Sequence, residues 1–385
     1  MGDPIPTFIQ RRLRQLDAEG LECICAIRKG QGNALGLRNG HPVVLPRVSI
    51  KDAAISLKTV LSFLWRPRVA YRLWTCRPRS SFKRNLVWLI NHFNLTKLRG
   101  IDLIHLQWIG MADDYRWLRH YYRCPIIASA RGSQVTVYPH TSPAYLDKLL
   151  RCFDAVDYIH CVSEDIRIRC TELGASPTKL FINYNGVDLT FFTPPTLPRP
   201  TTGETQLIST GALIWRKGYV YQLLALKSLL QQGYNCRLNI IGDGPDLQGL
   251  QYTAFSLGIS DQVTFHGALP AEKVRDLLQQ AHIYLSTSAA EGLANSVLEA
   301  AACGLPVVAF DCEGMREVIS DEKSGYIVPY GEIELFTSHI AQLISHQADA
   351  VRMGGAGRQL AASAFDSKIH VQHMYQQYRR ICAPE

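Results

Sequence analysis

The segment from residue 282 to residue 311 constrains the fold more than any other part of this sequence. An apolar run that begins at His282 ends at Leu285, small residues follow, and apolar residues with helical spacing start at Gly292. Cys303-Gly304 and Pro306 end that predicted helix, because glycine caps helices and proline cannot continue them. A short apolar strand, 307–310, comes next. A β–α–β unit of this kind predicts a parallel sheet in an α/β protein.

Two glutamates flank the predicted helix, Glu291 at or just before its start and Glu299 within it. A helix beginning at Gly292 would separate them by roughly 12 Å along its axis. Its unpaired first-turn donors suit an anion such as a diphosphate, and they would be the amides of Gly292, Leu293, Ala294 and Asn295. Carboxylates on both sides suit a nucleotide sugar, which has hydroxyls at both ends. The plainer interpretation is that Glu291 pairs with the helix dipole in the first turn and that Glu299 is a solvated helix residue.

A second strand–loop–helix unit begins at residue 205. The predicted strand 205–210 leads into the loop 211–218, GALIWRKG, and then into a helix from Tyr219 to about Gln232. Arg216 and Lys217 lie at the start of this helix, where cations oppose the helix dipole, which indicates a bound anion. The plainer interpretation is a surface pair of cations. The next predicted strand ends at Gly242-Asp243-Gly244-Pro245, where glycines permit close backbone approach and Pro245 is expected to begin a helix.

Taken together, these segments resemble the signature of glycosyltransferase family 4. The matching residues are Glu291–Ala309, Gly211, Lys217-Gly218, Ile241–Pro245, Val263–Gly267 and Gly325–Pro329. The resemblance implies a retaining, nucleotide-sugar-dependent enzyme of the GT-B fold, with two Rossmann-like doubly wound domains that face each other across a cleft. The motif WRKG at 215–218 is similar to the branch that makes bacterial exopolysaccharides of the colanic acid type.

The resemblance also implies roles for individual residues. Lys217 matches the family's phosphate lysine, and Arg216 would replace the arginine that usually follows the first glycine, where Ala212 stands here. Glu291 would orient the donor sugar and Glu299 the ribose. With these cations on the diphosphate, no metal is expected. The remaining donor-binding residues would be Gly211, Gly242 and Gly244, and the base-reading loop Gly267, Ala268 and Leu269.

The family pattern implies four parts of the chain: an acceptor-binding domain at 1–190, a linker at 191–204, a nucleotide-sugar-binding domain at 205–365 and a helix at 366–385 that crosses back to the first domain. Met1–Pro6 is too short for the strand and glycine-rich loop that the family places before the first helix. We therefore expect either a start codon placed late or an N-terminal sheet that lacks a strand.

Two residues of the first domain are candidates for the cleft. Arg131 stands where the family often has a histidine, at the end of a predicted strand, and a cleft role and a structural role are equally favoured. His105 is the weaker candidate, because a hydrogen-bonded core histidine is the more common case.

Composition and cysteine pattern agree with a globular protein of two domains. The 385 residues are 47% hydrophobic and 19% charged, and no apolar run approaches the ~20 residues of a membrane-spanning helix. The N-terminus has no apolar signal-peptide core. The eleven cysteines form no CxxC pair and no zinc spacing, so we expect reduced, mostly buried thiols and a cytoplasmic location.

Positive charge is concentrated in the first half. Residues 1–190 hold 27 Lys and Arg against 15 Asp and Glu, and residues 51–100 hold eleven basic residues against Asp52 alone, interleaved with aromatics. This pattern favours peripheral contact with an anionic membrane at the inner face of the plasma membrane over a solvated helical face. No nucleic-acid motif accompanies it. The apolar segment 55–65 would dock on the membrane or cover the core.

These patterns predict transfer of a hexose from a nucleoside diphosphate sugar to a lipid-linked or growing saccharide acceptor, in bacterial polysaccharide biosynthesis. Two alternatives remain open. A GT-B nucleotide-sugar epimerase would act on the same donor without an acceptor, and a non-catalytic protein would bind the sugar nucleotide only.

Overall fold

The structure is a computed structural model that describes residues 7–28, 40–45, 67–76, 85, 88–89, 92–199 and 203–383. The chain divides into two compact units. The first contains Met1–Ser129, Lys148–Ile159 and Val371–Glu385, and the second contains Ala130–Asp147 and His160–His370. The domain limits that the sequence suggests at 190 and 205 stay predictions.

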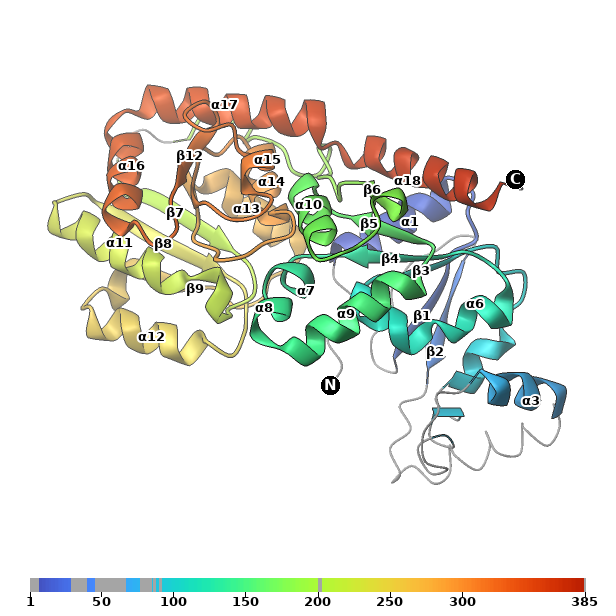
Figure 1. The fold of residues 1–385 in the computed structure, drawn as a ribbon. Helices are drawn as coiled ribbons and strands as arrows, with labels where there is room; N and C mark the ends of the chain where they lie inside the picture. The colour runs from blue at the N-terminus through green and yellow to red at the C-terminus, as the bar shows by residue number, and fades with distance from the viewer. Residues whose placement is uncertain are drawn as a thin grey trace. The chain divides into compact units, whose positions relative to one another are not determined.

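A six-stranded sheet forms the centre of the second unit (Figure 1). All its neighbouring strands pair in parallel, in the order β12-β11-β10-β7-β8-β9. The strands are β7 (Thr205–Thr210), β8 (Cys236–Ile241), β9 (Val263–Phe265), β10 (Ile283–Ser286), β11 (Val307–Phe310) and β12 (Gly325–Val328). Because β7 is first in the chain and the order runs outward from it in both directions, the sheet is doubly wound and reverses between β7 and β10.

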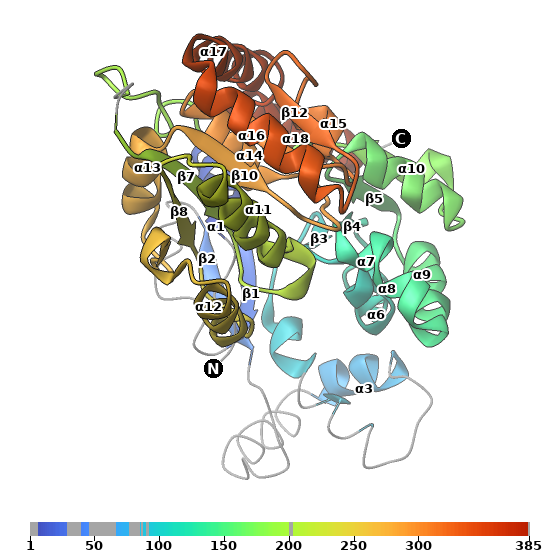
Figure 2. The ribbon, with the colours of Figure 1, turned by 90° about the vertical axis from the view of Figure 1, so that its left-hand side faces the viewer.

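Helices cover this sheet, and the predicted β–α–β unit is confirmed in β10, α14 and β11. Helix α11 packs against α12, α16 and β8, whereas α14 packs against α17, β10 and β11 (Figure 2). Leu207, Leu223, Leu238 and Phe336 belong to the fully buried core between these layers. The helices of this part are α11 (Tyr219–Gln231), α12 (Leu247–Ser256), α13 (Ala271–Gln280), α14 (Asn295–Ala302), α15 (Met315–Val318), α16 (Ile333–Ser345) and α17 (Gln347–Ala364).

A four-stranded sheet has the order β3-β4-β5-β6. Its strands are β3 (Ile104–Leu106), β4 (Ile126–Ala130), β5 (Tyr158–Cys161) and β6 (Leu180–Ile182). All five residues of β4 are buried, as expected for a central strand covered on both faces. The helices around it are α5 (Ala112–Tyr115), α6 (Trp117–Tyr122), α7 (Ser133–Thr136), α8 (Tyr138–Thr141), α9 (Pro143–Ala155) and α10 (Glu164–Glu172).

The N-terminal elements are α1 (Thr7–Ala18), β1 (Ile24–Arg28), β2 (His41–Leu45) and α3 (Pro67–Thr75). Strands β1 and β2 pair in parallel as a sheet of their own, separate from the four-stranded sheet among the described strands. The predicted segment 55–65 and most of the basic region 51–100 lie outside the described residues.

The C-terminal helix α18 (Ser367–Cys382) connects back to the first unit. The hydroxyl of Tyr378 is hydrogen-bonded to Nδ1 of His105, and Sγ of Cys382 lies 3.6 Å from the carbonyl oxygen of Asp102. The predicted return of the last helix is therefore confirmed.

Candidate functional site

The reversal of strand order brings two loops together that carry predicted site residues. The loop 211–218 follows β7 and the loop 287–294 follows β10, and these strands are neighbours. The amide of Ala289 donates to the carbonyl of Arg216 over 2.7 Å. The hydroxyl of Thr287 lies 3.1 Å from the carbonyl oxygen of Lys217 and 2.9 Å from that of Gly218. Doubly wound sheets bind ligands at this position, beyond the carboxyl ends of the strands at the switch point.

An ion pair between Lys217 and Glu291 joins the two loops. The two side chains are only 18% and 13% exposed, and the hydroxyl of Ser288 donates to Oε1 of Glu291 over 2.8 Å. Burial lowers the pKa of Lys217, but the adjacent Glu291 carboxylate raises it by more, so the pKa lies above its usual value. The ammonium group is therefore charged at neutral pH.

Glycines let three loops meet at this edge without side chains between them. Gly242 has φ +144°, and a Cβ there would lie 1.8 Å from the carbonyl oxygen of Gly211. A Cβ on Gly244 would lie 2.3 Å from the carbonyl oxygen of Leu213. The amide of Gly242 donates to the carbonyl of Gly267 over 2.9 Å, and exposed Ala268 and half-buried Leu269 follow in that loop. The predicted donor-binding loops after β7, β8 and β9 thus lie side by side.

Lys217 also lies beside Gly211. A Cβ on Gly211 would be 3.3 Å from Cε of Lys217, and the hydroxyl of Tyr219 donates to the carbonyl of Gly211 over 3.1 Å. Arg216 is half-buried next to Lys217. The ammonium group of Lys217 is thus held between the loop after β7 and the loop after β10.

Two predicted helix starts are wrong. Helix α14 begins at Asn295, not at Gly292, and α12 begins at Leu247, not at Pro245. The amide of Asn295 donates to the carbonyl of Leu293 over 2.8 Å, so it is not an unpaired donor. Glu291 is four residues before the helix, and the 12 Å spacing that assumed a continuous helix does not hold. Glu299 lies half-buried in the second turn of α14.

Backbone crowding explains why the helix starts late. A Cβ on Gly292 would lie 2.5 Å from the amide nitrogen of Gly132, and a Cβ on Gly314 would lie 2.7 Å from the carbonyl oxygen of Gly292. The chain at Gly292 is therefore enclosed by two other backbones, and Gly292, Leu293 and Ala294 are buried in a loop.

The two cleft candidates of the first half have different surroundings. Arg131 donates over 3.4 Å to Oδ1 of Asn185, whose amide nitrogen lies 3.3 Å from Oδ1 of Asn295. This chain of side chains connects Arg131 to the predicted donor-binding segment. His105 belongs to the other unit, and both its ring nitrogens are hydrogen-bonded, Nδ1 to Tyr378 and Nε2 to the Ser129 hydroxyl at 2.8 Å.

Sequence reasoning missed several residues of this region. These residues are Ser288, which donates to Glu291, Asn185, which bonds to Asn295, and Glu317, whose carboxylate accepts from the first amides of α10. The turn-forming Asn-Gly dipeptide at 185–186 is a local signal for the second of them. Residue spacing alone does not show that these segments meet.

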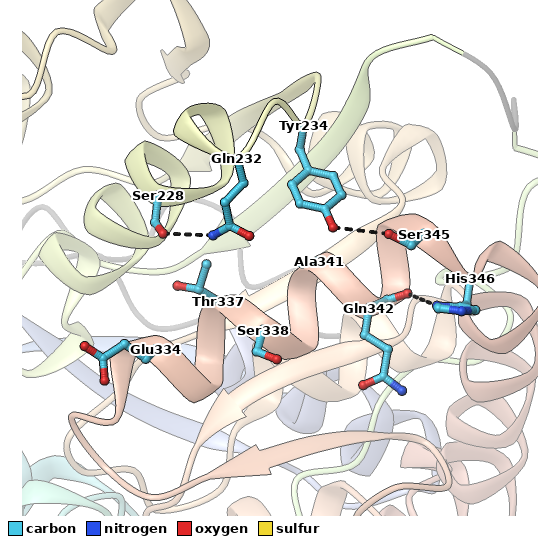
Figure 3. A pocket seen from close by; sticks show the side chains of 10 residues that line it. All are labelled: Ser228, Gln232, Tyr234, Glu334, Thr337, Ser338, Ala341, Gln342, Ser345 and His346. Atoms are coloured by element: carbon cyan, nitrogen blue, oxygen red, sulfur yellow. Dashed lines mark hydrogen bonds between the residues drawn. The ribbon is translucent and has the colours of Figure 1, made fainter.

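A separate cavity lies between α11 and α16 (Figure 3). It has a volume of about 470 Å³ and a polar lining that includes Gln232, Tyr234, Glu334 and Gln342. None of the predicted donor residues lines it. Some lining side chains bond to one another, Gln232 to the Ser228 hydroxyl at 3.1 Å and Tyr234 to the Ser345 hydroxyl at 3.3 Å.

The described residues offer neither a metal-ligand cluster nor a membrane-spanning helix. They contain no group of three or more His, Cys, Asp or Glu side chains arranged to hold a metal ion. In the same part of the chain, no helix is both long enough and apolar enough to cross a membrane. All eleven cysteines are free, and six of them are buried.

The fold and the loops at the switch point define a protein of the GT-B class. HepE from Anabaena, solved with UDP and glucose, superposes with a TM-score of 0.76 over 99% of this chain and 98% of its own, at 15% identity. That likeness concerns the fold, which has two Rossmann-like parallel-sheet domains.

Sequence comparisons then give the family. The model "Glycosyltransferase Family 4" matches residues 7–191, and the model "Glycosyl transferases group 1" matches residues 198–360. A GDP-mannose-dependent alpha-(1-6)-phosphatidylinositol monomannoside mannosyltransferase from Mycolicibacterium smegmatis is 30% identical over 69% of this chain and 74% of its own. The chain belongs to the glycosyltransferases of family 4 type.

The putative colanic acid biosynthesis glycosyltransferase WcaL of Escherichia coli is 28% identical over 53% of this chain and 51% of its own length. Across three curated relatives, this chain spans from 37% to 74% of the relative's length. The resemblance to the colanic acid branch is therefore borne out at the level of family.

Proposed function

We propose that this chain transfers a hexose from a nucleoside diphosphate sugar to a lipid-linked or growing saccharide acceptor, with retained anomeric configuration. The ion pair between Lys217 and Glu291 at the switch point is the observation that supports this most strongly. Family membership supports the reaction class. The names of the relatives support an acceptor in bacterial polysaccharide or glycolipid synthesis.

Lys217 would stabilise the diphosphate that leaves. Before the donor binds, the buried ammonium is neutralised by Glu291, which limits the cost of burying a lone charge. When the donor binds, its phosphate oxygens would replace Glu291 as the partner of the Lys217 ammonium group. The Glu291 carboxylate could then accept hydrogen bonds from the sugar hydroxyls. Arg216 adds a second cation. We propose that these cations act in place of a metal ion.

The bond between the anomeric carbon and the β-phosphate oxygen breaks, and its electron pair passes to that oxygen. The acceptor hydroxyl oxygen forms the new bond to the same carbon from the same face, and its proton passes to the departing phosphate. No side chain of this chain is assigned as a covalent nucleophile. Preorganised cations at the point where charge develops are the main catalytic contribution expected here.

The remaining donor contacts follow from the resemblance. Glu299 would bind the ribose hydroxyls, and the backbone of Gly267, Ala268 and Leu269 would bind the base. The amides of Gly292, Leu293 and Ala294 would approach the phosphates from the loop before α14, and Asn295 would do so from its first turn.

The acceptor would be reached at the inner face of the plasma membrane. The basic and aromatic composition of residues 51–100 supports this, because such segments bind anionic lipid surfaces.

The test begins with calorimetric titration of UDP-, GDP- and ADP-sugars, followed by transfer to a lipid-linked saccharide and determination of the product's anomeric configuration. We expect Lys217→Ala and Glu291→Ala each to lose about 100-fold or more in transfer, because single groups that stabilise transition-state charge have effects of this size. Transfer should continue in the presence of a chelator.

Lys273→Ala is the matched control, because Lys273 is an exposed lysine on α13 of the same unit. It should keep transfer within twofold of the unmodified protein. Near-normal transfer by both Lys217→Ala and Glu291→Ala would contradict the proposal. Conversion of the donor without an acceptor would identify an epimerase, and binding without turnover a non-catalytic protein.

A further inference from the structure

The carboxylate of Glu317 accepts three hydrogen bonds from segments far away in the sequence. Oε2 accepts from the amide of Glu164 at 3.0 Å and from the hydroxyl of Tyr184 at 2.8 Å. Oε1 accepts from the amide of Asp165 at 3.1 Å. Glu317 lies on α15, in the segment between β11 and β12, and all these residues belong to the second unit.

Two of these donors are the first amides of α10. The first amides of a helix have no partner within it, and they lie at the positive end of the helix dipole. Ser163, the N-cap residue of α10, accepts from the third amide of the same first turn, that of Ile166, at 3.2 Å. Glu317 therefore completes the N-terminus of α10 with a negative charge supplied from another part of the chain.

Asp165 on α10 makes the reciprocal contact with the segment that carries Glu317. Its Oδ2 accepts from the amide of Gly314 at 2.7 Å, so each segment gives a carboxylate to the other segment's backbone. Gly314 has φ +73°, a conformation that favours glycine. The segment 314–317 is thus fixed at both ends by charge-assisted hydrogen bonds.

This fixed segment touches the predicted site. A Cβ on Gly314 would lie 2.7 Å from the carbonyl oxygen of Gly292 and 3.2 Å from Cα of Leu293. Gly292 directly follows Glu291, whose carboxylate pairs with Lys217. A shift of Gly314 away from α10 would therefore remove one wall of the loop that carries Glu291.

Tyr184 remains a hydrogen-bond donor over the neutral pH range. Burial raises the pKa of its phenol, and the hydrogen bond to Glu317 raises it further, above the usual value of such a group. The phenol is therefore protonated at neutral pH and can donate to the Glu317 carboxylate.

We propose that Glu317 is a positioning residue, which holds the Glu291–Gly292 backbone in its reactive place by anchoring the 314–317 segment to α10. The proposal rests on the function proposed above. Glu317 does not need to touch the donor, so its loss should reduce the rate of transfer more than the affinity for the nucleotide.

The experiment compares Glu317→Gln with the unmodified protein. Titration with UDP or GDP, whichever binds the unmodified protein, gives the dissociation constant and the number of competent sites. We expect kcat per competent site to fall tenfold or more, while the dissociation constant changes less than threefold. Glutamine keeps the shape but carries no charge and turns an N–H group toward a backbone amide.

Three further variants sharpen the result. Asp165→Asn weakens the return bond to Gly314 and should lower kcat per site at least threefold. Tyr184→Phe leaves both backbone bonds of Glu317 intact and should lower it less than threefold. Glu172→Gln is the matched control, because Glu172 is exposed on the same helix and its ion pair is with Arg169 at 2.8 Å, on the surface of that helix. For this variant, kcat should stay within twofold.

A normal kcat per site in Glu317→Gln overturns the inference, and so does a loss confined to the number of competent sites, since that loss reports folding alone. If Glu317→Gln does not fold, normal kcat per site in Asp165→Asn overturns it. Failure of the unmodified protein to transfer any sugar would refute the proposed function itself, and this inference with it.

Discussion

At the scale of single residues, the site depends on where side chains are absent as much as on where charges lie. Lys217 and Glu291 meet because the loops that carry them approach closely, and they approach closely because glycines line the contacts. Gly242 shows this most clearly, since no room exists for a β-carbon between it and the carbonyl of Gly211.

Gly242→Ala should therefore disrupt the donor loops. Its φ of +144° is unfavourable for alanine, and the added Cβ would lie 1.8 Å from a backbone oxygen that cannot rotate away. We expect a loss of about 1–3 kcal/mol in stability and at least a tenfold weaker binding of UDP or GDP. Thermal unfolding and calorimetric titration measure the two effects.

Gly249→Ala provides the control. Gly249 is inside α12, and a Cβ there would meet nothing within 4 Å. Alanine should stabilise the protein by about 0.5–1 kcal/mol and leave nucleotide binding unchanged. Equal losses of stability and nucleotide binding in Gly242→Ala and Gly249→Ala would show that the close backbone approach at Gly242 does not cause the loss.

The sequence identified the charged residues but not their pairing. Lys217 and Glu291 could each be selected from local patterns, such as cations at a helix start or an acid before a helix. Their contact depends on β7 and β10 being neighbours, which is a property of strand order. Local patterns also placed a helix start at Gly292, because its small residues have helical spacing. Contact with Gly132 and Gly314, which no local pattern contains, holds that segment in a loop.

At the scale of elements, α14 is held at its C-terminal end by two arginines. Arg358 on α17 donates to the carbonyls of Ala302 and Phe192, each at 2.8 Å, and to that of Leu189 at 3.0 Å. Arg199 donates to the carbonyl of Cys303 at 2.7 Å. Cations at the negative end of a helix dipole stabilise the helix. Arg358 also holds the segment 189–192 against α17 through the carbonyls of Leu189 and Phe192.

Arg358→Ala should cost about 3 kcal/mol, because three carbonyls lose a charged donor in a partly buried place. Urea denaturation followed by hydrogen exchange at the amides of α14 measures this, and exchange there should quicken. Arg352→Ala is the control on the same helix: Arg352 is 59% exposed and pairs with Asp349, so the change should be below about 0.5 kcal/mol. If Arg358→Ala also lowered the free energy of unfolding by less than about 0.5 kcal/mol, the hydrogen bonds of Arg358 would contribute little to stability.

Element types were predicted better than element partners. The strands β7 and β11 have the predicted bounds, since each is a clear apolar or amphipathic run between turn residues. The helices α9 and α13 carried no prediction, although α9 buries Leu149, Cys152 and Phe153 along one face. Strands β1 and β2 pair only with each other among the described strands, which no local pattern indicates, because pairing is decided by tertiary packing and not by propensity.

At the scale of the whole molecule, the end of the chain completes the first unit. Residues from Val371 onward cluster with Met1–Ser129, and Val371 and Met374 are buried. Tyr378 bonds to His105, the residue that follows the first position of β3. The last helix therefore supplies core and hydrogen bonds to strands that come more than 200 residues earlier.

Removing residues 371–385 should therefore destabilise the first unit selectively. Hydrogen exchange should quicken in β3, which loses the hydrogen bond from Tyr378 to His105 within a unit that also loses the buried Val371 and Met374. It should stay slow in β7, β8 and β10, which form a core of their own. Tyr378→Phe should reproduce a small part of this effect, about 1 kcal/mol, because it removes one hydrogen bond to His105. Tyr375→Phe, whose hydroxyl meets the exposed Arg379, should have no measurable effect. Equal loss of protection in both sheets would show that the two units unfold as one, and the last helix would then stabilise the whole chain and not one part of it.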